Sequence, residues 1–108
     1  MFKKFDIVLV DFPFSDLKEV KKRPALVINS LEGNNTIFCQ ITTKRRNINK
    51  YEITLQRENC VGNILFDSFI YLDMIFTLHK DLVYNKIGEV SNIKTREEIN
   101  RKIKLVFD

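Results

Sequence analysis

The sequence predicts a mainly β protein: a small, strongly curved sheet or partial barrel with one helix at its C-terminal end. Short apolar and β-branched segments follow one another at close spacing, and turn-forming residues separate them. Helical periodicity appears only near the C-terminus. The chain has 108 residues, of which 44% are hydrophobic, including nine Phe. That content is enough for one core, so we expect a single domain spanning residues 1–108.

The strand signals come in chain order. The first is the run DIVLVDF, and the second and third are PALVINS and TIFCQIT, joined by a turn in which Gly33 supplies a positive φ. The fourth alternates, with Tyr51, Ile53 and Leu55 on one face and the polar Glu52 on the other. The expected strands are 6–12, 24–30, 36–42 and 51–56, with one long or two short strands over 62–72 and another over 86–90.

The C-terminal segment predicts a helix over 95–107. Ile99, Ile103 and Val106 follow the i, i+4, i+7 spacing of one buried helical face. Thr95 and Glu98 match a T-x-x-E capping box, which predicts that the helix begins at Thr95.

Several classes of protein are disfavoured. No apolar stretch approaches the ~20 residues that cross a bilayer. The basic and apolar N-terminus is interrupted by Asp6 and Asp11 and has no small-residue cleavage site, so we expect a cytoplasmic protein. Cys39, Cys60 and the single His79 lack the spacing of a zinc site, and we expect neither a metal nor a cofactor.

The net charge is +4 and the sequence pI is about 9.1, a modest excess of cations. Its distribution is more informative, because no acid occurs between Glu32 and Glu52 while four cations do. Together with a second basic segment at 21–23, these predict two basic loops that form one positive face if their strands are neighbours. Charge alone is equally compatible with two solvated loops. The cations are Lys21, Lys22, Arg23, Lys44, Arg45, Arg46 and Lys50.

Arg23 stands out among these cations because Pro24 follows it. Proline restricts the preceding residue to extended geometry, and ALVI then continues as a strand. An arginine fixed at the start of a strand is well placed to bind phosphate, since its planar guanidinium grips two oxygens at once.

Five segments in order along nearly the whole chain carry a resemblance to a known family: DIVLVDFPFSDLKEVKKRPALVI, CQITTK, YEI, GNILFDSFIYLDMIFTLHKDLV and KIGEV. In their sequences and their order they resemble the MazF/PemK/Kid family of toxin–antitoxin ribonucleases. The resemblance implies an SH3-like small β-barrel of the MazF/PemK/CcdB type with a C-terminal helix, and a homodimer. It also implies metal-independent cleavage of single-stranded mRNA and a cognate antitoxin whose tail occupies the RNA groove.

Metal-independent cleavage of RNA uses the substrate's own 2′-hydroxyl, and the protein must hold the phosphate and offset its growing charge. In this family the arginine of the R-P motif contributes to catalysis, which implies that role for Arg23. Thr42 matches the family threonine after the central strand, with Thr43 as the neighbouring alternative. Ser68 matches a family serine near the groove.

Asp73 departs from one branch of the family. Kid-like members carry an R-x-D pair here, whereas this chain has Tyr71-Leu72-Asp73, so the acid matches and the arginine does not. Two interpretations stay open: Asp73 is a catalytic base paired with Arg23, or it orients neighbours while Arg23 and Thr42 carry the reaction.

The remaining candidates are residues that would bind RNA. Cations beside the cut site would contact the backbone, which gives affinity and salt sensitivity rather than sequence choice. Aromatic side chains could stack on unpaired bases. The cations are Lys21, Lys22, Lys44, Arg45 and Arg46, and the aromatic residues are Phe14 and Tyr71.

Two other functions fit a barrel of this type. A gyrase poison of the CcdB type binds a protein and cleaves nothing, but the chain ends KLVFD on a helix and keeps the R-P and Thr elements. A non-catalytic RNA-binding barrel is the second alternative, and Tyr71 in place of arginine is its support.

Overall fold

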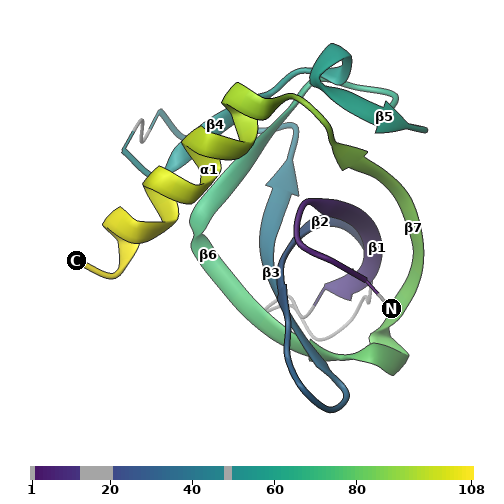
Figure 1. Ribbon diagram of the computed structural model, residues 1–108. Helices are drawn as coiled ribbons and strands as arrows, with labels where there is room; N and C mark the ends of the chain where they lie inside the picture. The colour runs from purple at the N-terminus through teal and green to yellow at the C-terminus, as the bar shows by residue number, and fades with distance from the viewer. Residues whose placement is uncertain (1, 13–20, 48–49) are drawn as a thin grey trace.

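The structure is a computed structural model that describes residues 2–12, 21–47 and 50–108. Strands make up most of it, and one α-helix closes the chain (Figure 1). The strands are β1 (Asp6–Phe12), β2 (Lys21–Ser30), β3 (Asn35–Thr42), β4 (Glu52–Leu55), β5 (Cys60–Gly62), β6 (Ser68–His79) and β7 (Val83–Val90). The helices are α1 (Ile93–Val106) and the 3₁₀ turns η1 (Arg57–Asn59) and η2 (Lys80–Leu82).

The strands form one antiparallel sheet in the order β4-β6-β3-β2-β1-β7-β5. The ribbon curls around on itself, and α1 lies along β6 and β4 on one side (Figure 1). β4 and β5 are edge strands that do not pair with each other, so the expected barrel is not closed. The prediction of a mainly β fold with a C-terminal helix is confirmed. None of the described helices is long and apolar enough to cross a membrane.

Strand pairing lengthens β2, β6 and β7 well beyond the predicted bounds. β2 begins at Lys21 rather than Pro24 because Lys21 and Lys22 pair with Phe12 and Asp11 of β1. The basic segment at 21–23 therefore belongs to a strand and not to a loop. β6 continues to His79 along β3, and β7 begins at Val83 along β1.

The helix begins two residues before the predicted start. Asn92 is the N-cap, and its Oδ1 accepts hydrogen bonds from the Thr95 amide at 2.9 Å and from the Thr95 hydroxyl at 3.1 Å. The capping box predicted at Thr95 and Glu98 is therefore wrong. Asparagine is among the preferred N-cap residues, because its side-chain oxygen accepts from the free amides of the first turn.

Both faces of the central strands are buried. Along β1, Ile7 faces a core cluster that includes Leu26, Ile70 and Ile99, while Val8 and Val10 face a second cluster on the other side. Alternate residues of a strand point to opposite faces, so a strand covered on both sides reads as the continuous apolar run seen in the sequence.

Two interruptions of pairing shape the sheet. Pairs Ser30–Thr36 and Asn29–Ile37 are followed by Val27–Phe38, which leaves Ile28 as a bulge in β2. In β6, Ile75 pairs with Cys39 but Tyr71 pairs with Gln40, so the residues between them leave the ladder of β3. Asp73 lies in this second bulge. Bulges bend strands and redirect side chains, and they are common beside functional sites.

Candidate functional site

A pocket of about 210 Å³ lies where β2 begins and β3 ends. It brings together several residues that the sequence selected from separate segments, and we call it the Arg23 pocket. It combines a guanidinium, an ammonium group, three hydroxyls and an amide. Its lining residues are Arg23, Pro24, Gln40, Ile41, Thr42, Thr43, Lys44 and Ser68.

The antiparallel register explains why these residues meet. Ala25 pairs with Gln40, and continuing that register by two residues puts Arg23 opposite Thr42. Directly opposed residues of an antiparallel pair lie on one face of the sheet. On the other side of β3, Thr42 pairs with Phe69 of β6, which places Ser68 beside the same strand end.

The hydroxyl of Thr42 is oriented by the chain that follows it. Its Oγ1 accepts a hydrogen bond from the Lys44 backbone amide at 3.2 Å. The O–H of Thr42 thus stays available as a donor toward a ligand in the pocket. Arg23 and Lys44 are exposed side chains whose cationic groups suit an anionic ligand.

Ser68 also lines a second cavity beside the Arg23 pocket. Its Oγ donates to the Phe66 carbonyl at 3.3 Å, and the cavity is apolar, with a volume of about 270 Å³. The two hollows share Pro24, Ile41, Thr43 and Ser68. A ligand with both a charged and an apolar part can therefore contact both.

Asp73 pairs with Arg46, a residue that the sequence assigned to RNA binding. Arg46 donates to Asp73 through Nη1 at 3.1 Å and Nη2 at 2.5 Å. The hydrogen bonds from Arg46 hold the pKa of Asp73 below its ordinary value, although partial burial acts in the opposite direction. A carboxylate with a lowered pKa is a weak base, so this geometry favours an orienting role over proton abstraction.

Tyr71 lies inside the protein rather than on its surface. It is 7% exposed, and its hydroxyl donates to the Lys44 carbonyl. The Arg46 guanidinium lies 3.7 Å from the centre of its ring. With this ring face covered, the structure argues against the predicted stacking of Tyr71 on a base.

Glu52 was missed as a candidate. The alternation of the strand predicts an exposed face for it, yet its side chain is only 4% exposed. Its Oε1 accepts from the Arg46 backbone amide at 3.0 Å, and the Arg45 guanidinium lies 3.9 Å from its Oε2. The only signal in the sequence was that Glu52 is the first acid after the four cations between Glu32 and Glu52.

The other predicted RNA-binding residues lie elsewhere. Lys22 has its ammonium 4.1 Å from the centre of the Tyr84 ring, and Tyr84 donates to Asp11 at 2.8 Å. Lys22 is the neighbour of Arg23 on β2, so it faces the opposite side of the sheet. Phe14 and the side chain of Lys21 lie outside the described residues.

A larger cavity, about 600 Å³, lies at the other end of β2 and β3. Phe2, small polar residues of the β2–β3 turn and two residues of η2 line it. Its volume exceeds that of the Arg23 pocket, but among its described lining residues Lys80 is the only cation, and Asp81 lies beside it. Within the described ranges, no group of three or more His, Cys, Asp or Glu side chains is arranged so that it could hold a metal ion.

The fold and site define a small curved-sheet protein with a pocket suited to phosphate. The chain belongs to the PemK-like, MazF-like toxins of type II toxin–antitoxin systems, whose family model matches residues 3–107. No curated protein sequence matches it.

Solved structures share the fold at low sequence identity. A mycobacterial endoribonuclease in complex with its cognate antitoxin is 19% identical, with a TM-score of 0.76, and the match covers 99% of this chain and 95% of that one. The Mycobacterium tuberculosis toxin MazF-mt6 is also 19% identical, with a TM-score of 0.76 and coverage of 95% and 96%. MazF in the MazE–MazF complex of Deinococcus radiodurans is 15% identical, with a TM-score of 0.73 and coverage of 97% and 94%.

Proposed function

We propose that this toxin is an endoribonuclease that cleaves single-stranded mRNA at short sequence motifs without a metal ion. The observation that carries the proposal is the Arg23 pocket, where an arginine, a threonine hydroxyl and a lysine face one hollow at the ends of two paired strands. Structural neighbours that are endoribonucleases support the same activity. Because mRNA is the substrate, we expect the toxin to act in the cytoplasm.

The chemistry follows from the substrate. The 2′ oxygen attacks the adjacent phosphorus and forms a bond to it, while the bond from phosphorus to the 5′ oxygen breaks. The 2′-hydroxyl loses its proton and the departing 5′ oxygen gains one. The products are a 2′,3′-cyclic phosphate and a 5′-hydroxyl.

We assign the roles by side-chain chemistry. Arg23 binds the scissile phosphate and offsets the charge that builds on its oxygens, because a guanidinium stays charged and donates in pairs. Thr42 donates its hydroxyl hydrogen bond to the same phosphate, with Thr43 as the alternative donor. Lys44 and Ser68 bind the flanking backbone. Hydrogen-bond donors that are already in place where negative charge develops in the transition state contribute a large part of the rate enhancement.

A cognate antitoxin is the expected protein partner. Solved relatives include an endoribonuclease and a MazF in complex with antitoxins. A positive groove suits an acidic, largely disordered segment that orders when it binds and so competes with RNA. We also expect a homodimer, for which membership of the family is the support.

The test is cleavage of RNA by the purified toxin in excess EDTA. We expect cuts at one short motif, with 2′,3′-cyclic phosphate and 5′-hydroxyl ends. A matched RNA with a single 2′-deoxy residue before the cut should bind with similar affinity but remain intact, since the attacking group is gone while the phosphates remain.

The outcomes separate the alternatives. Rapid cleavage of the 2′-deoxy RNA would exclude 2′-hydroxyl attack. Binding of RNA with no cleavage of any sequence would favour a non-catalytic RNA-binding barrel. Inhibition of gyrase, with neither RNA binding nor cleavage, would favour a poison of the CcdB type.

A further inference from the structure

We propose that Arg46, Glu52, Tyr71 and Asp73 form a cluster that positions the pocket's lysine and threonine, and that Asp73 acts as a positioning residue and not as the catalytic base. We call these four residues the Arg46 cluster. The proposal deepens the function proposed above and rests on it for its kinetic consequences. The contacts within the cluster can be tested independently.

The cluster holds the backbone of the segment that leaves β3. The Tyr71 hydroxyl donates to the Lys44 carbonyl, and the Lys44 amide donates to Thr42 Oγ1 at 3.2 Å. Two residues later, the Arg46 amide donates to Glu52 Oε1 at 3.0 Å. The segment then turns at Asn47, whose φ of 63° is a conformation that asparagine tolerates. The backbone N–H and C=O of Lys44 are thus both held by hydrogen bonds.

The Arg46 side chain fastens this segment to β6. Its guanidinium stacks on the Tyr71 ring at 3.7 Å and donates twice to Asp73. Tyr71 and Asp73 are two residues apart on β6, so their side chains lie on the same side of that strand, where both contact Arg46. Glu52 pairs directly with Tyr71 across β4 and β6, which completes the cluster.

Burial and charge make Arg46 unlike its neighbours Lys44 and Arg45. Its side chain is 21% exposed, against 57% for Arg45, and its two acidic partners are 4% and 30% exposed. The hydrogen bonds with Asp73 raise the pKa of Arg46 even though burial opposes this. A guanidinium already engaged by two carboxylates and an aromatic ring has little left to offer a phosphate.

The same pairing limits what Asp73 can do. A carboxylate held by both arms of a guanidinium stays ionised through the neutral range, because its pKa is lowered. Protonation, and with it loss of the pair, comes only as the pH falls below the ordinary value for aspartate. Asp73 therefore acts on the pocket through Arg46 and the Lys44–Arg46 backbone.

A double-mutant cycle of Arg46→Ala and Asp73→Ala tests the proposal. Residues that act as one unit give non-additive losses. We expect each variant to lower kcat by about tenfold, on the scale of one charge-assisted hydrogen bond, and the double variant to be no slower than either. The acid side of the pH–rate profile should keep its position in all three. Asp81→Ala, at an exposed residue of η2, is the matched control.

Hydrogen exchange tests the cluster without any measurement of catalysis. Glu52 protects the backbone amide of residue 46 from hydrogen exchange. Exchange of this amide should accelerate in Arg46→Ala and Asp73→Ala and stay unchanged in Asp81→Ala. Tyr71→Phe keeps the ring and removes only the hydroxyl, and it should lower kcat by about three- to tenfold, the scale of a neutral hydrogen bond. This milder variant remains informative if an alanine variant unfolds.

Three results would overturn the proposal. The first is a loss in Asp73→Ala at least a hundredfold greater than in Arg46→Ala, with the acid limb abolished, as expected for a general base. The second is a multiplicative loss in the double variant. The third is unchanged exchange of the Arg46 amide. If the wild-type protein cleaves no RNA, the proposed function is refuted. The hydrogen-exchange experiment would then still test whether the Arg46 cluster holds the backbone.

Discussion

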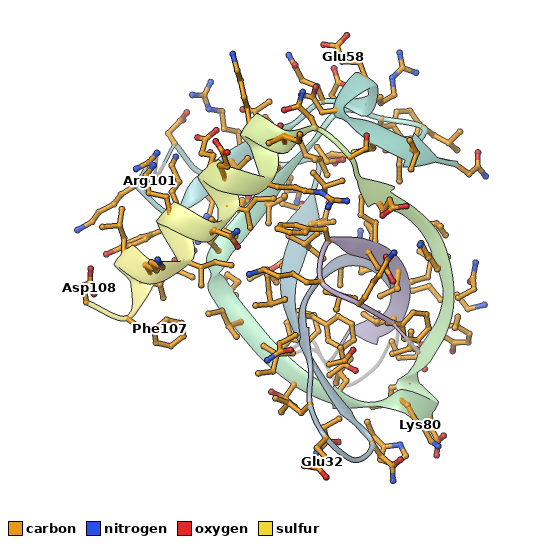
Figure 2. All side chains as sticks on the ribbon, viewed as in Figure 1. Glu32, Glu58, Lys80, Arg101, Phe107 and Asp108 are labelled. Atoms are coloured by element: carbon orange, nitrogen blue, oxygen red, sulfur yellow. The ribbon has the colours of Figure 1, made fainter. Side chains whose placement is uncertain are left out.

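The two ends of the β2–β3 pair carry two different hollows, and the smaller one is the better candidate site. At the end formed by Arg23 and Thr42 the pocket is about 210 Å³, and at the turn end the cavity is about 600 Å³. Glu32 of the β2–β3 turn and Lys80 of η2 both belong to the turn end of the molecule (Figure 2). There the Lys80 amide donates to the Asn34 carbonyl at 2.7 Å.

The difference lies in how charge is fixed. The Arg23 pocket gathers cations and hydroxyls on adjacent strand ends, and side chains of β4 and β6 hold the segment that follows. At the turn end Lys80 stands beside Asp81, and mainly small polar residues surround them. Volume measures room for a ligand, whereas preorganised donors determine what chemistry a pocket supports.

Substitution of Arg23 should have the largest effect on catalysis. Arg23→Lys keeps the charge but loses the two-pronged geometry, so we expect kcat to fall by about a hundredfold or more, the scale of losing one oxyanion donor. RNA affinity should change far less. Single-turnover cleavage and binding of the 2′-deoxy RNA measure the two quantities separately.

Arg57→Lys is the control for this substitution, since Arg57 is an exposed arginine in η1 and lies outside both hollows. It should leave kcat unchanged. Equal losses in Arg23→Lys and Arg57→Lys would show that the Arg23 pocket has no special part in catalysis.

A smaller effect is expected at Thr42. Thr42→Val keeps the shape of the side chain and removes a hydroxyl that we assign to the phosphate, so kcat should fall by about tenfold. Thr36→Val makes the same change on the same strand at the turn end, where Thr36 is buried. That variant should retain full activity when melting temperatures confirm that it is folded. A loss in Thr43→Val and none in Thr42→Val would move the hydroxyl donor to Thr43.

The sequence alone could not predict whether Thr42 or Thr43 lies opposite Arg23. The turn at Gly33 was predictable, and the structure gives Gly33 a φ of 97°. Continuing the register from Ser30–Thr36 without interruption would put Arg23 opposite Thr43. The bulge at Ile28 shifts the register by one residue and brings Thr42 across instead. A one-residue slip changes which face every side chain occupies, and nothing in the local sequence marks this bulge.

The fold was more predictable than the site because most strands carry local signals. The bounds of β1 agree with the prediction, and Ile53 and Leu55 are buried as the alternation predicted. The second half of β6 lacks a clear alternation of apolar and polar residues. It forms a strand because β3 pairs with it. The Arg46–Asp73 pair joins a loop to a bulge, so the sequence could count the cations but could not show that Arg46 pairs with Asp73.

The smallest expected effect concerns Lys44 and Lys80, one lysine at each end. If Lys44 contacts an RNA phosphate, Lys44→Ala should reduce the slope of log K against log salt by about 0.7, the value for one phosphate on a single strand. Between 50 and 200 mM salt this amounts to roughly a threefold difference in relative affinity. Lys80→Ala removes the same charge from the molecule, so it controls for long-range electrostatics and should leave the slope unchanged. Titrations of the 2′-deoxy RNA at four or more salt concentrations measure both slopes. Equal changes in the two variants would mean that RNA responds only to net charge, and the distinction between the two ends would then hold for catalysis but not for binding.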